Sequence, residues 1–433
     1  MKSALRLLLM WLAATHFANA QTCTNCRYLA PVFDSVLVTR DYHFGEGRNS
    51  NGQLQQLYLD VYEPYGDTLS ARPVLMFAFG GGFVQGSKDE WYVVEICKQF
   101  ARMGYVCAAM DYRVGINPLE IVFLQHMRIF FRPMQDMRAS VQFMKAQFAE
   151  LGNPHRIDTS RIVIGGASAG GITALMVAHC DKPSEMAEMG NLNVLDTLGG
   201  FYATSGFYPN YSWNSIGTVN ISGALINANW IEPGDKPIIS AHDNADVVVP
   251  YGYGPLGGAS LAGLTLQGSY VVDSIANTKN VCSYLYTMEG QDHPNTGMGM
   301  PYIYSVVYRI AQRMYGIITD RSFCCPLQVE INPGDTLYTA PGMPDHTLEA
   351  SLINAQGGAN VQWCAMACNF SSTASTVTFP VDTSLHFISL IATENNCMAA
   401  DLFILLDSSY LYSSVTNALN NEAIRVFPQP AGN

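Results

Sequence analysis

The pattern of hydrophobic and polar positions divides the chain into two parts that meet near residue 320. In the first part, apolar runs such as RPVLMFAF at 72–79 alternate with segments of helical spacing such as 91–102. A run without polar alternation is typical of a strand buried on both faces of a parallel sheet. Strands that alternate with helices therefore predict a doubly wound, mostly parallel α/β sheet.

The same pattern predicts the order of elements in the first part. Alternating apolar and polar residues at 35–42 and 57–61 indicate an opening hairpin. The remaining elements are expected as strands at 72–79, 105–111, 161–164, 199–206, 237–242 and 281–288, and as helices at 91–102, 134–151 and 302–315. Segments 207–235 and 251–275 exceed the roughly 2–6 residues usual for connections in such folds, so we expect them to roof a site.

Beyond residue 320 the helical spacing disappears. Short alternating runs follow at 328–331, 377–379, 387–391 and 402–406. Short strands separated by turn residues predict a small all-β, immunoglobulin-like sandwich of roughly 90–100 residues. Such a domain is expected to bind, space or stabilise, and contact with a glycan or a cell surface is one expectation for it. The expected domains are 1–20 (signal peptide), 21–320 (α/β domain), 321–420 (sandwich) and 421–433 (linker).

The chain opens like a secretory signal peptide. Lys2 and Arg6 form a basic start, Leu7 to Ala14 an apolar core, and Ala18 to Ala20 a small-residue cleavage site. No later run reaches the about 18 apolar residues that a membrane span needs. We therefore expect an exported protein that is cut after Ala20 and has no membrane span.

Composition limits the partners and the cross-links. With a net charge of −12 and 13% charged residues, the chain lacks the basic stripe of a nucleic-acid-binding protein. An exported chain with 11 cysteines is expected to form disulfides, and the odd count leaves at least one thiol unpaired. We expect a small N-terminal disulfide between Cys23 and Cys26, with a redox or metal role as the alternative. The cluster of five cysteines after residue 320 predicts a small domain that is cross-linked by disulfides. His126, His155 and His179 lack metal-ligand spacing, so no metal site or cofactor is expected.

The strongest chemical signal is the stretch RIVIGGASAGGITAL at 161–175. Its residues Gly166 to Gly170 fit G-x-S-x-G, in which small residues let a strained strand-to-helix turn expose a serine hydroxyl. The helix that follows adds partial positive charge near that oxygen. Ser168 is therefore the candidate nucleophile, and an ordinary glycine-rich turn is the alternative.

A serine nucleophile needs a base and an acid that orients the base. Asp246 and His293 each follow a predicted buried strand, so we expect them to meet Ser168 at the carboxyl edge of the sheet. His293 is the candidate base and Asp246 the candidate acid. Asp243, on the same loop, is the alternative acid, and His242 is the less favoured base.

The three glycines at 80–82 follow a predicted buried strand and indicate an oxyanion hole. Glycine lets the backbone approach a substrate oxygen closely, and a turn that only reverses the chain is the alternative. We expect the backbone N–H groups of Gly81, Gly82 and Ala169 to be the donors. The aromatic residues expected either to line the substrate pocket or to pack the long loops are Phe83, Trp91, Trp213 and Trp230.

Five motifs carry a family resemblance: FGGGF at 79–83, DYR at 111–113, GGASAGG at 165–171, HDNADVVVP at 242–250 and DH at 292–293. Over about residues 33–318 the chain resembles α/β-hydrolases of the carboxylesterase, hormone-sensitive-lipase-like group, in which Ser, Asp and His follow in this order. The resemblance implies a serine esterase that needs no cofactor. One departure is Phe79, where those enzymes usually have a histidine that braces the glycine loop.

The end of the chain carries a second resemblance. IRVFPQPA at 424–431 is similar to the opening of the C-terminal sorting signal of the Bacteroidetes type IX secretion system. This likeness implies a protein that reaches the extracellular space or the cell surface through the periplasm.

The residues together predict hydrolysis of a small-molecule or polymer-linked carboxylic ester through an acyl-Ser168 intermediate. A polysaccharide-deacylating, feruloyl or polyester esterase is a narrower version of this prediction. A serine peptidase of the same fold is a second alternative. A non-catalytic adhesion protein is a third, and such a protein would be expected to lack a triad member.

Overall fold

The computed structural model describes residues 26–117, 127–257, 264–290, 292–293, 300–325, 327–332, 336–339, 346–365, 371–379 and 386–407. The expected signal peptide and linker, together with Cys23, His126 and Cys368, lie outside these residues.

The centre of the molecule is an eight-stranded sheet with the order β1-β2-β4-β3-β5-β6-β8-β11. Its strands are β1 (Val36–Arg48), β2 (Leu54–Pro64), β3 (Arg72–Ala78), β4 (Val106–Met110), β5 (Ile157–Ala167), β6 (Gly217–Ile221), β8 (Ile238–Asp243) and β11 (Ser283–Met288). β2 pairs antiparallel with β1 and β4, and the remaining pairs are parallel. β3 and β4 are buried at every position, as their nearly all-apolar sequences predict. The predicted doubly wound α/β sheet is confirmed.

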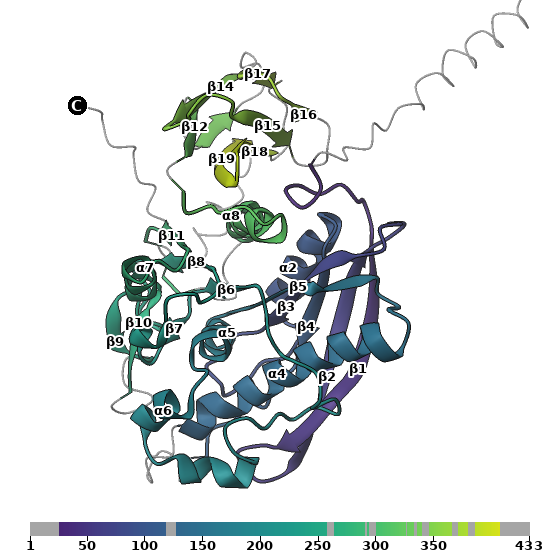
Figure 1. Cartoon of the computed structure of the whole chain (residues 1–433), viewed down its shortest axis with the longest axis vertical. Helices are drawn as coiled ribbons and strands as arrows, with labels where there is room; N and C mark the ends of the chain where they lie inside the picture. The colour runs from purple at the N-terminus through teal and green to yellow at the C-terminus, as the bar shows by residue number, and fades with distance from the viewer. Residues whose placement is uncertain are drawn as a thin grey trace, which may run out of the picture.

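Helices cover both faces of this sheet (Figure 1). They are α2 (Trp91–Arg102), α4 (Met127–Glu150), α5 (Ala169–His179), α7 (Ser269–Thr278) and α8 (Met300–Ile318), with a short α6 (Pro183–Met186). α4 packs against α5 on one face, and α2 packs against α8 on the other. α2 buries Val93, Ile96 and Phe100, whose helical spacing forms one apolar stripe. No helix in the described ranges is long and apolar enough to cross a membrane.

The strand predicted at 199–206 is wrong. Those residues form turns, because Gly199 and Gly200 adopt left-handed φ angles of 88° and 85°. The strand that joins the sheet at this point is β6, which lies within the segment 207–235 expected as a roof loop. That expectation is corrected, because the segment supplies a central strand.

The second expected roof loop, 251–275, also contains regular structure. Short strands β7 (Ala224–Leu225), β9 (Tyr253–Pro255) and β10 (Thr265–Gly268) form a small antiparallel sheet, and α7 begins at Ser269. Helix α4 begins at Met127, before the predicted start at residue 134, and continues through Pro133.

The β-region after α8 consists of two small sheets (Figure 1). Their orders are β12-β14-β17 and β13-β19-β18-β15-β16. The strands are β12 (Gln328–Asn332), β13 (Thr336–Thr339), β14 (His346–Ile353), β15 (Asn360–Ala365), β16 (Ser371–Ser372), β17 (Thr376–Phe379), β18 (His386–Glu394) and β19 (Cys397–Asp407). Leu348 of one sheet and Trp363 of the other are fully buried in one shared core. The predicted small all-β sandwich is confirmed as a fold class.

The sandwich packs against α8. The rings of Tyr308 in α8 and Phe387 in β18 stack with centroids 4.8 Å apart. Gln312 donates to the backbone oxygen of Asp401 at 2.7 Å, and Arg313 donates to that of Ala400 at 3.1 Å. Helix α8 is therefore shared between the α/β domain and the sandwich.

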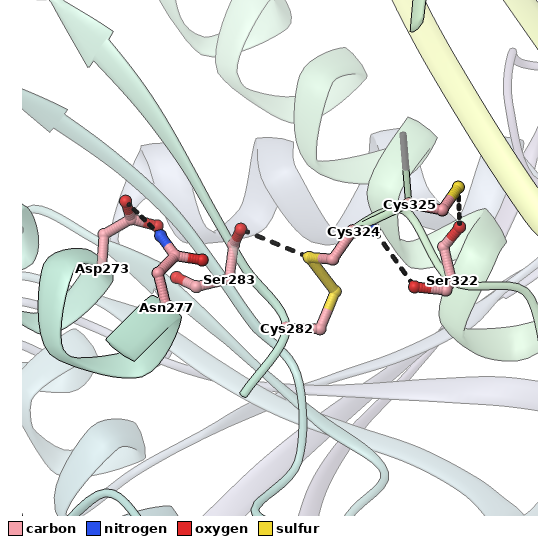
Figure 2. Close-up of a disulfide and its surroundings, with 7 residues drawn as sticks. All are labelled: Asp273, Asn277, Cys282, Ser283, Ser322, Cys324 and Cys325. Atoms are coloured by element: carbon pink, nitrogen blue, oxygen red, sulfur yellow. Dashed lines mark hydrogen bonds between the residues drawn. A yellow bond between two sulfur atoms is a disulfide. The ribbon is translucent and has the colours of Figure 1, made fainter. Parts of the chain in front are cut away.

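Two disulfides join the same parts of the chain. Cys26, ahead of β1, pairs with Cys364 in β15, and Cys282 pairs with Cys324 just after α8 (Figure 2). The expected pairing of Cys26 with Cys23 is corrected. Cys26 lies buried beside the sandwich and pairs with Cys364 instead of Cys23. The two disulfides of the described residues connect the sandwich and the segment just after α8 to the α/β domain, rather than one sandwich strand to another.

Candidate active site

Ser168 lies on a strained turn between β5 and α5. Its φ of 54° and ψ of −120° define a backbone conformation that residues other than glycine rarely adopt, as expected for a nucleophile elbow. The glycines of this turn let the surrounding backbone pack so closely that no side chain would fit at their positions. A Cβ on Gly170 would lie 2.3 Å from the backbone oxygen of Ala78. The Ser168 side chain is thus held at the carboxyl edge of the sheet, above the N-terminus of α5.

The structure brings Ser168, His293 and Asp246 together. His293 Nε2 lies 2.9 Å from Ser168 Oγ, and His293 Nδ1 lies 2.6 Å from Asp246 Oδ2. The three residues follow β5, β11 and β8, whose carboxyl ends lie at the same edge of the sheet. Because the carboxylate accepts from Nδ1, Nε2 of the neutral ring is free to accept the serine proton.

The carboxylate that faces His293 belongs to Asp246. Its Oδ1 accepts from the backbone N–H groups of Val248 and Val249 at 2.8 and 2.9 Å. Burial alone would raise the pKa of Asp246, but hydrogen bonds from His242 and His293 lower it well below its usual range. The alternative acid, Asp243, accepts from the N–H of Ala245 at 2.8 Å. Asp246 therefore stays ionised beside His293.

Asp292 braces the loop that carries His293. Its Oδ1 accepts from the backbone N–H of His293 at 2.7 Å and from that of Val247 at 3.2 Å. The loops after β8 and β11 are thereby tied together.

Two of the expected oxyanion donors, Gly81 and Gly82, line a cavity that opens over Ser168. Ser168 also lines it, and Gly81 and Gly82 adopt φ angles of 118° and 61°. Within the described part of the chain, the backbone N–H groups of Gly81 and Gly82 have no hydrogen-bond acceptor. Ala169 is the first residue of α5, so its N–H has no partner within the helix. Three donors at one nucleophile can stabilise a developing oxyanion.

Two tyrosines hold the glycine loop, which follows Phe79 in this chain. Phe79 stacks on Tyr112 with ring centroids 4.1 Å apart, and the Tyr112 hydroxyl donates to the Phe79 backbone oxygen at 2.9 Å. The backbone N–H of Gly80 donates to the Tyr92 hydroxyl at 2.6 Å. Gly86 makes room for the Phe79 ring, since a Cβ there would lie 2.6 Å from it. The loop is thus fixed by these contacts.

A cavity of about 360 Å³ opens over Ser168 and His293. Helices α2 and α8 form one wall of it, with Trp91, Ile303 and Val306 among the lining residues. These side chains make the wall largely apolar, which suits an uncharged organic group.

Of the four aromatic residues expected at the substrate pocket, only Trp91 lines this cavity. Phe83 is buried and packs edge-on against Phe130. Trp213 lies under the guanidinium of Arg138, and Trp230 is buried in the 3₁₀ turn 228–230. In the described part of the chain, these three side chains make packing contacts and are not among the residues that line this cavity.

The sequence did not point to Tyr92 or Tyr302, and both line the cavity. Tyr92 had one signal, its place at the start of a helix directly after the glycine loop. Tyr302 had none, because only the packing of α8 brings it there. No group of three or more His, Cys, Asp or Glu side chains in the described ranges is arranged to hold a metal ion.

The strand order and the nucleophile elbow define an α/β-hydrolase fold. A model of the BD-FAE family matches residues 59–198, which include the glycine loop and Ser168. The chain is 29% identical over 164 residues to Esterase LipC of Mycobacterium tuberculosis (strain ATCC 25618 / H37Rv), in an alignment that covers 37% of this chain and 35% of LipC. The alignment spans only about a third of the length of that relative.

Solved structures of Thermogutta terrifontis esterase 2 are also similar. The form phosphorylated by paraoxon is 19% identical, with a TM-score of 0.44, and the match covers 66% of this chain and 95% of that one. The apo form is 20% identical, with a TM-score of 0.45 and coverage of 64% and 94%.

Proposed function

We propose that this protein is a serine esterase that hydrolyses carboxylic esters through an acyl-Ser168 intermediate. One observation carries the proposal: an unbroken chain of hydrogen bonds of 2.9 and 2.6 Å runs from Ser168 through His293 to Asp246, beside an open cavity. The BD-FAE match and the likeness to Esterase LipC support an ester as the substrate.

In the acylation step, Ser168 Oγ attacks the ester carbonyl carbon while His293 Nε2 takes the hydroxyl proton. The carbonyl oxygen becomes an oxyanion, which accepts hydrogen bonds from the backbone of Gly81, Gly82 and Ala169. Asp246 stabilises the imidazolium that forms. His293 then gives its proton to the leaving alcohol, the C–O bond breaks, and an acyl-enzyme remains.

In the deacylation step, His293 takes a proton from a water molecule that attacks the acyl carbon. The same backbone donors hold the second oxyanion. His293 returns the proton to Ser168 Oγ as the acid leaves. The sum of the two steps is ester plus water giving acid plus alcohol, so no cofactor is required.

The cavity wall favours an apolar group on the substrate. Ile221, Ile303 and Val306 line the cavity near Ser168, and Trp91 lies at its rim with 37% of its surface exposed. Glu90 is also among the residues that line the cavity, and its negative charge disfavours anionic substrates. We therefore propose uncharged esters with an aliphatic or aromatic group.

Hydrolysis of p-nitrophenyl esters from acetyl to long acyl chains tests this function. We expect turnover that Ser168→Ala and His293→Ala each reduce by about four orders of magnitude or more. Ser140→Ala serves as a matched control, because Ser140 is a buried serine in α4 that does not line the cavity. A peptide amide run in parallel separates esterase from peptidase. Equal turnover by wild type and Ser168→Ala would contradict the mechanism.

We also infer that the enzyme is exported, in line with the signal-like start and the sorting-signal-like end of the sequence. The two disulfides support this, since such bonds form in oxidising compartments. Fractionation of cells that express the full chain should locate the protein outside the cytoplasm with both disulfides formed. Retention in the cytoplasm with reduced thiols would contradict the inference.

A further inference from the structure

A second histidine lies behind the triad carboxylate, and the mechanism above does not use it. His242 in β8 is fully buried, and its Nε2 lies 3.1 Å from Asp246 Oδ2. This oxygen is also the one that faces His293 Nδ1 at 2.6 Å. We propose that His242 is a positioning residue that fixes this carboxylate and limits the negative charge it presents to His293. The inference rests on the proposed function of the triad.

The contacts of His242 determine where its proton lies. Nε2 faces two acceptors, Asp246 Oδ2 and the backbone oxygen of Val249, each at 3.1 Å. A ring nitrogen between two acceptors must carry a proton. His242 therefore donates to Asp246 in either of its protonation states.

The other ring nitrogen is held from behind. Nδ1 of His242 lies 2.7 Å from Ser269 Oγ, which accepts from Asn220 Nδ2 at 2.9 Å. The serine proton has two possible acceptors, His242 Nδ1 at 2.7 Å and the backbone oxygen of Gly223 at 3.2 Å. The shorter contact favours donation to Nδ1, which makes His242 a neutral ring with its Nε2–H directed at Asp246. Asn220, Ser269 and His242 are all fully buried, so water does not compete for these bonds.

The carboxylate of Asp246 is saturated as a result. Oδ1 accepts from Val248 N and Val249 N, and Oδ2 accepts from His242 and His293. A carboxylate offers about four lone-pair sites, so none is left over and the group cannot rotate. The donor at His242 also withdraws charge from the oxygen that His293 uses, which weakens the stabilisation of the His293 imidazolium.

Other titratable groups surround this network. Asp292 contacts the backbone of His293, the Tyr251 ring lies edge-on to His242, and Tyr302 of α8 lies near Asp243 and Asp246. These groups remain in place in the variants below, so a change in titration reports on His242 itself.

The test compares His242→Leu with wild type by NMR of ¹⁵N-labelled histidine side chains across a pH series. We expect the titration midpoint of His293 to move up by about 0.5 pH unit or more, because Asp246 Oδ2 loses its second donor. The acid limb of the kcat/KM profile should move in the same direction. kcat/KM at neutral pH should fall about 10- to 100-fold, the scale of a small displacement of a catalytic group. His242→Gln places an amide donor near the same point and should restore part of both effects.

His179→Gln is the matched control. His179 is also a buried histidine that contacts a carboxylate, Asp235 at 2.8 Å, and it lies at the far end of α5. Its replacement should lower stability without moving the His293 midpoint. If His242→Leu does not fold, Ser269→Ala gives a smaller shift in the same direction, because Nε2–H becomes a weaker donor once Nδ1 loses its partner.

The outcomes separate the two proposals. A His293 midpoint that stays fixed or moves down in folded His242→Leu and Ser269→Ala overturns the role of His242. The NMR titration needs no turnover. If wild type hydrolyses no ester and the midpoint still moves up, the proposed function fails while the coupling of His242 to His293 stands.

Discussion

At the scale of single residues, aromatic contacts fix the glycine loop at 80–82. The Phe79 ring stacks on Tyr112, and the Tyr92 hydroxyl accepts the hydrogen bond of the Gly80 N–H at 2.6 Å. Tyr92 and Ser168 both lie close to Gly80. A Cβ placed on Gly80 would be 3.2 Å from the Tyr92 hydroxyl oxygen and 3.1 Å from Ser168 Cβ. Burial raises the pKa of Tyr92 to about 12, so the hydroxyl stays protonated at neutral pH.

Tyr92→Phe should therefore loosen the glycine loop, the proposed oxyanion hole, while leaving the cavity shape intact. We expect kcat to fall about 10-fold with little change in KM, because a displaced donor weakens the transition state more than the ground state. Tyr105→Phe is the control, since Tyr105 donates to the backbone of Tyr28 at 3.2 Å and does not line the cavity. Steady-state kinetics with a short-chain ester distinguishes them. Equal kcat in both variants would show that Tyr92 does not hold the loop.

The two carboxylates of the loop after β8 should differ sharply in their effect on catalysis. Asp246→Asn should lower kcat by about 10⁴-fold, because an amide favours the wrong tautomer of His293. Asp243→Asn should have a far smaller effect, since His293 Nδ1 lies 2.6 Å from Asp246 Oδ2, whereas Asp243 Oδ1 accepts from the backbone N–H of Ala245. Measured kcat values for the pair decide which carboxylate is the acid. A larger loss in Asp243→Asn would contradict the assignment.

Motif chemistry explains which site residues the sequence could reveal. Ser168, Asp246 and His293 lie in short glycine- and aspartate-rich segments directly after apolar runs, so the sequence indicates both the end of a strand and the reactive residue that follows it. The sequence does not indicate Tyr302 or the hydrogen-bond network behind His242, because their contacts join elements that are far apart in the chain. For Phe83, Trp213 and Trp230 the sequence could not distinguish a pocket residue from a packing residue, because an aromatic side chain can serve either role.

At the scale of elements, the turn between β5 and α5 determines where Ser168, the proposed nucleophile, lies. Gly166 and Gly170 approach each other and β3 so closely that a side chain on either would overlap the backbone. This close packing lets α5 begin immediately after Ser168. The glycines therefore serve packing as well as the strained backbone of the serine.

Gly170→Ala should destabilise the protein strongly. A Cβ there would lie 2.3 Å from the backbone oxygen of Ala78 and 2.6 Å from that of Phe79. We expect a loss of about 1–3 kcal/mol or more in the free energy of unfolding, together with lower activity as Ser168 shifts. Gly252→Ala is the control, because nothing lies within 4 Å of its Cβ position. Urea unfolding of both variants checks this, and equal midpoints would contradict the packing account.

Elements were predicted best where one physical signal dominates. The nearly all-apolar runs of β3 and β4 and the 3.6-residue stripe of α2 gave their positions to within a residue or two. The strand predicted at 199–206 failed because its two glycines form a turn, and β6 was missed because a short strand inside a polar segment has little pattern of its own. The pairing of Cys26 with Cys364 depends on the packing of the whole chain, which spacing cannot reveal.

At the scale of the whole molecule, α8 connects the cavity to the sandwich. Ile303 and Val306 on α8 line the cavity, while Tyr308 on the same helix stacks on Phe387 of the sandwich. Figure 1 shows α8 between the large sheet and the two small ones. The two disulfides also join the α/β domain to the sandwich and to the segment just after α8. We infer that the sandwich supports the cavity wall from behind.

Phe387→Ala should therefore alter both stability and substrate preference. Removing a buried phenylalanine costs about 3–5 kcal/mol, and the freed side of α8 should relax the cavity toward longer acyl chains. Ile388→Ala is the control, because the Ile388 side chain belongs to the core between the two small sheets. It should lower stability and leave the chain-length profile unchanged. Identical profiles in wild type and Phe387→Ala would contradict the support role.

Stability should also depend on acid pH through Glu63. This buried carboxylate contacts Arg72 at 2.6 Å and His155 at 2.7 Å. Burial alone would raise its pKa, but these two partners lower it overall. The stabilisation is complete above the unfolded glutamate value of about 4.3, and it is lost as the pH falls through the lower folded value. Urea midpoints should decline below about pH 4, less steeply in Glu63→Gln than in wild type. Glu330→Gln, exposed on β12, should behave like wild type, and an unchanged slope in Glu63→Gln would contradict this assignment.

The acyl-enzyme itself is the most direct test of the central claim. Wild type mixed with p-nitrophenyl acetate and quenched with acid within the first turnover should release a burst of p-nitrophenol close to one per enzyme. Mass spectrometry should then find the acetyl group on the peptide that contains Ser168, and on no peptide of Ser168→Ala. An acetyl group on another residue, or turnover without any adduct on Ser168, would contradict the account.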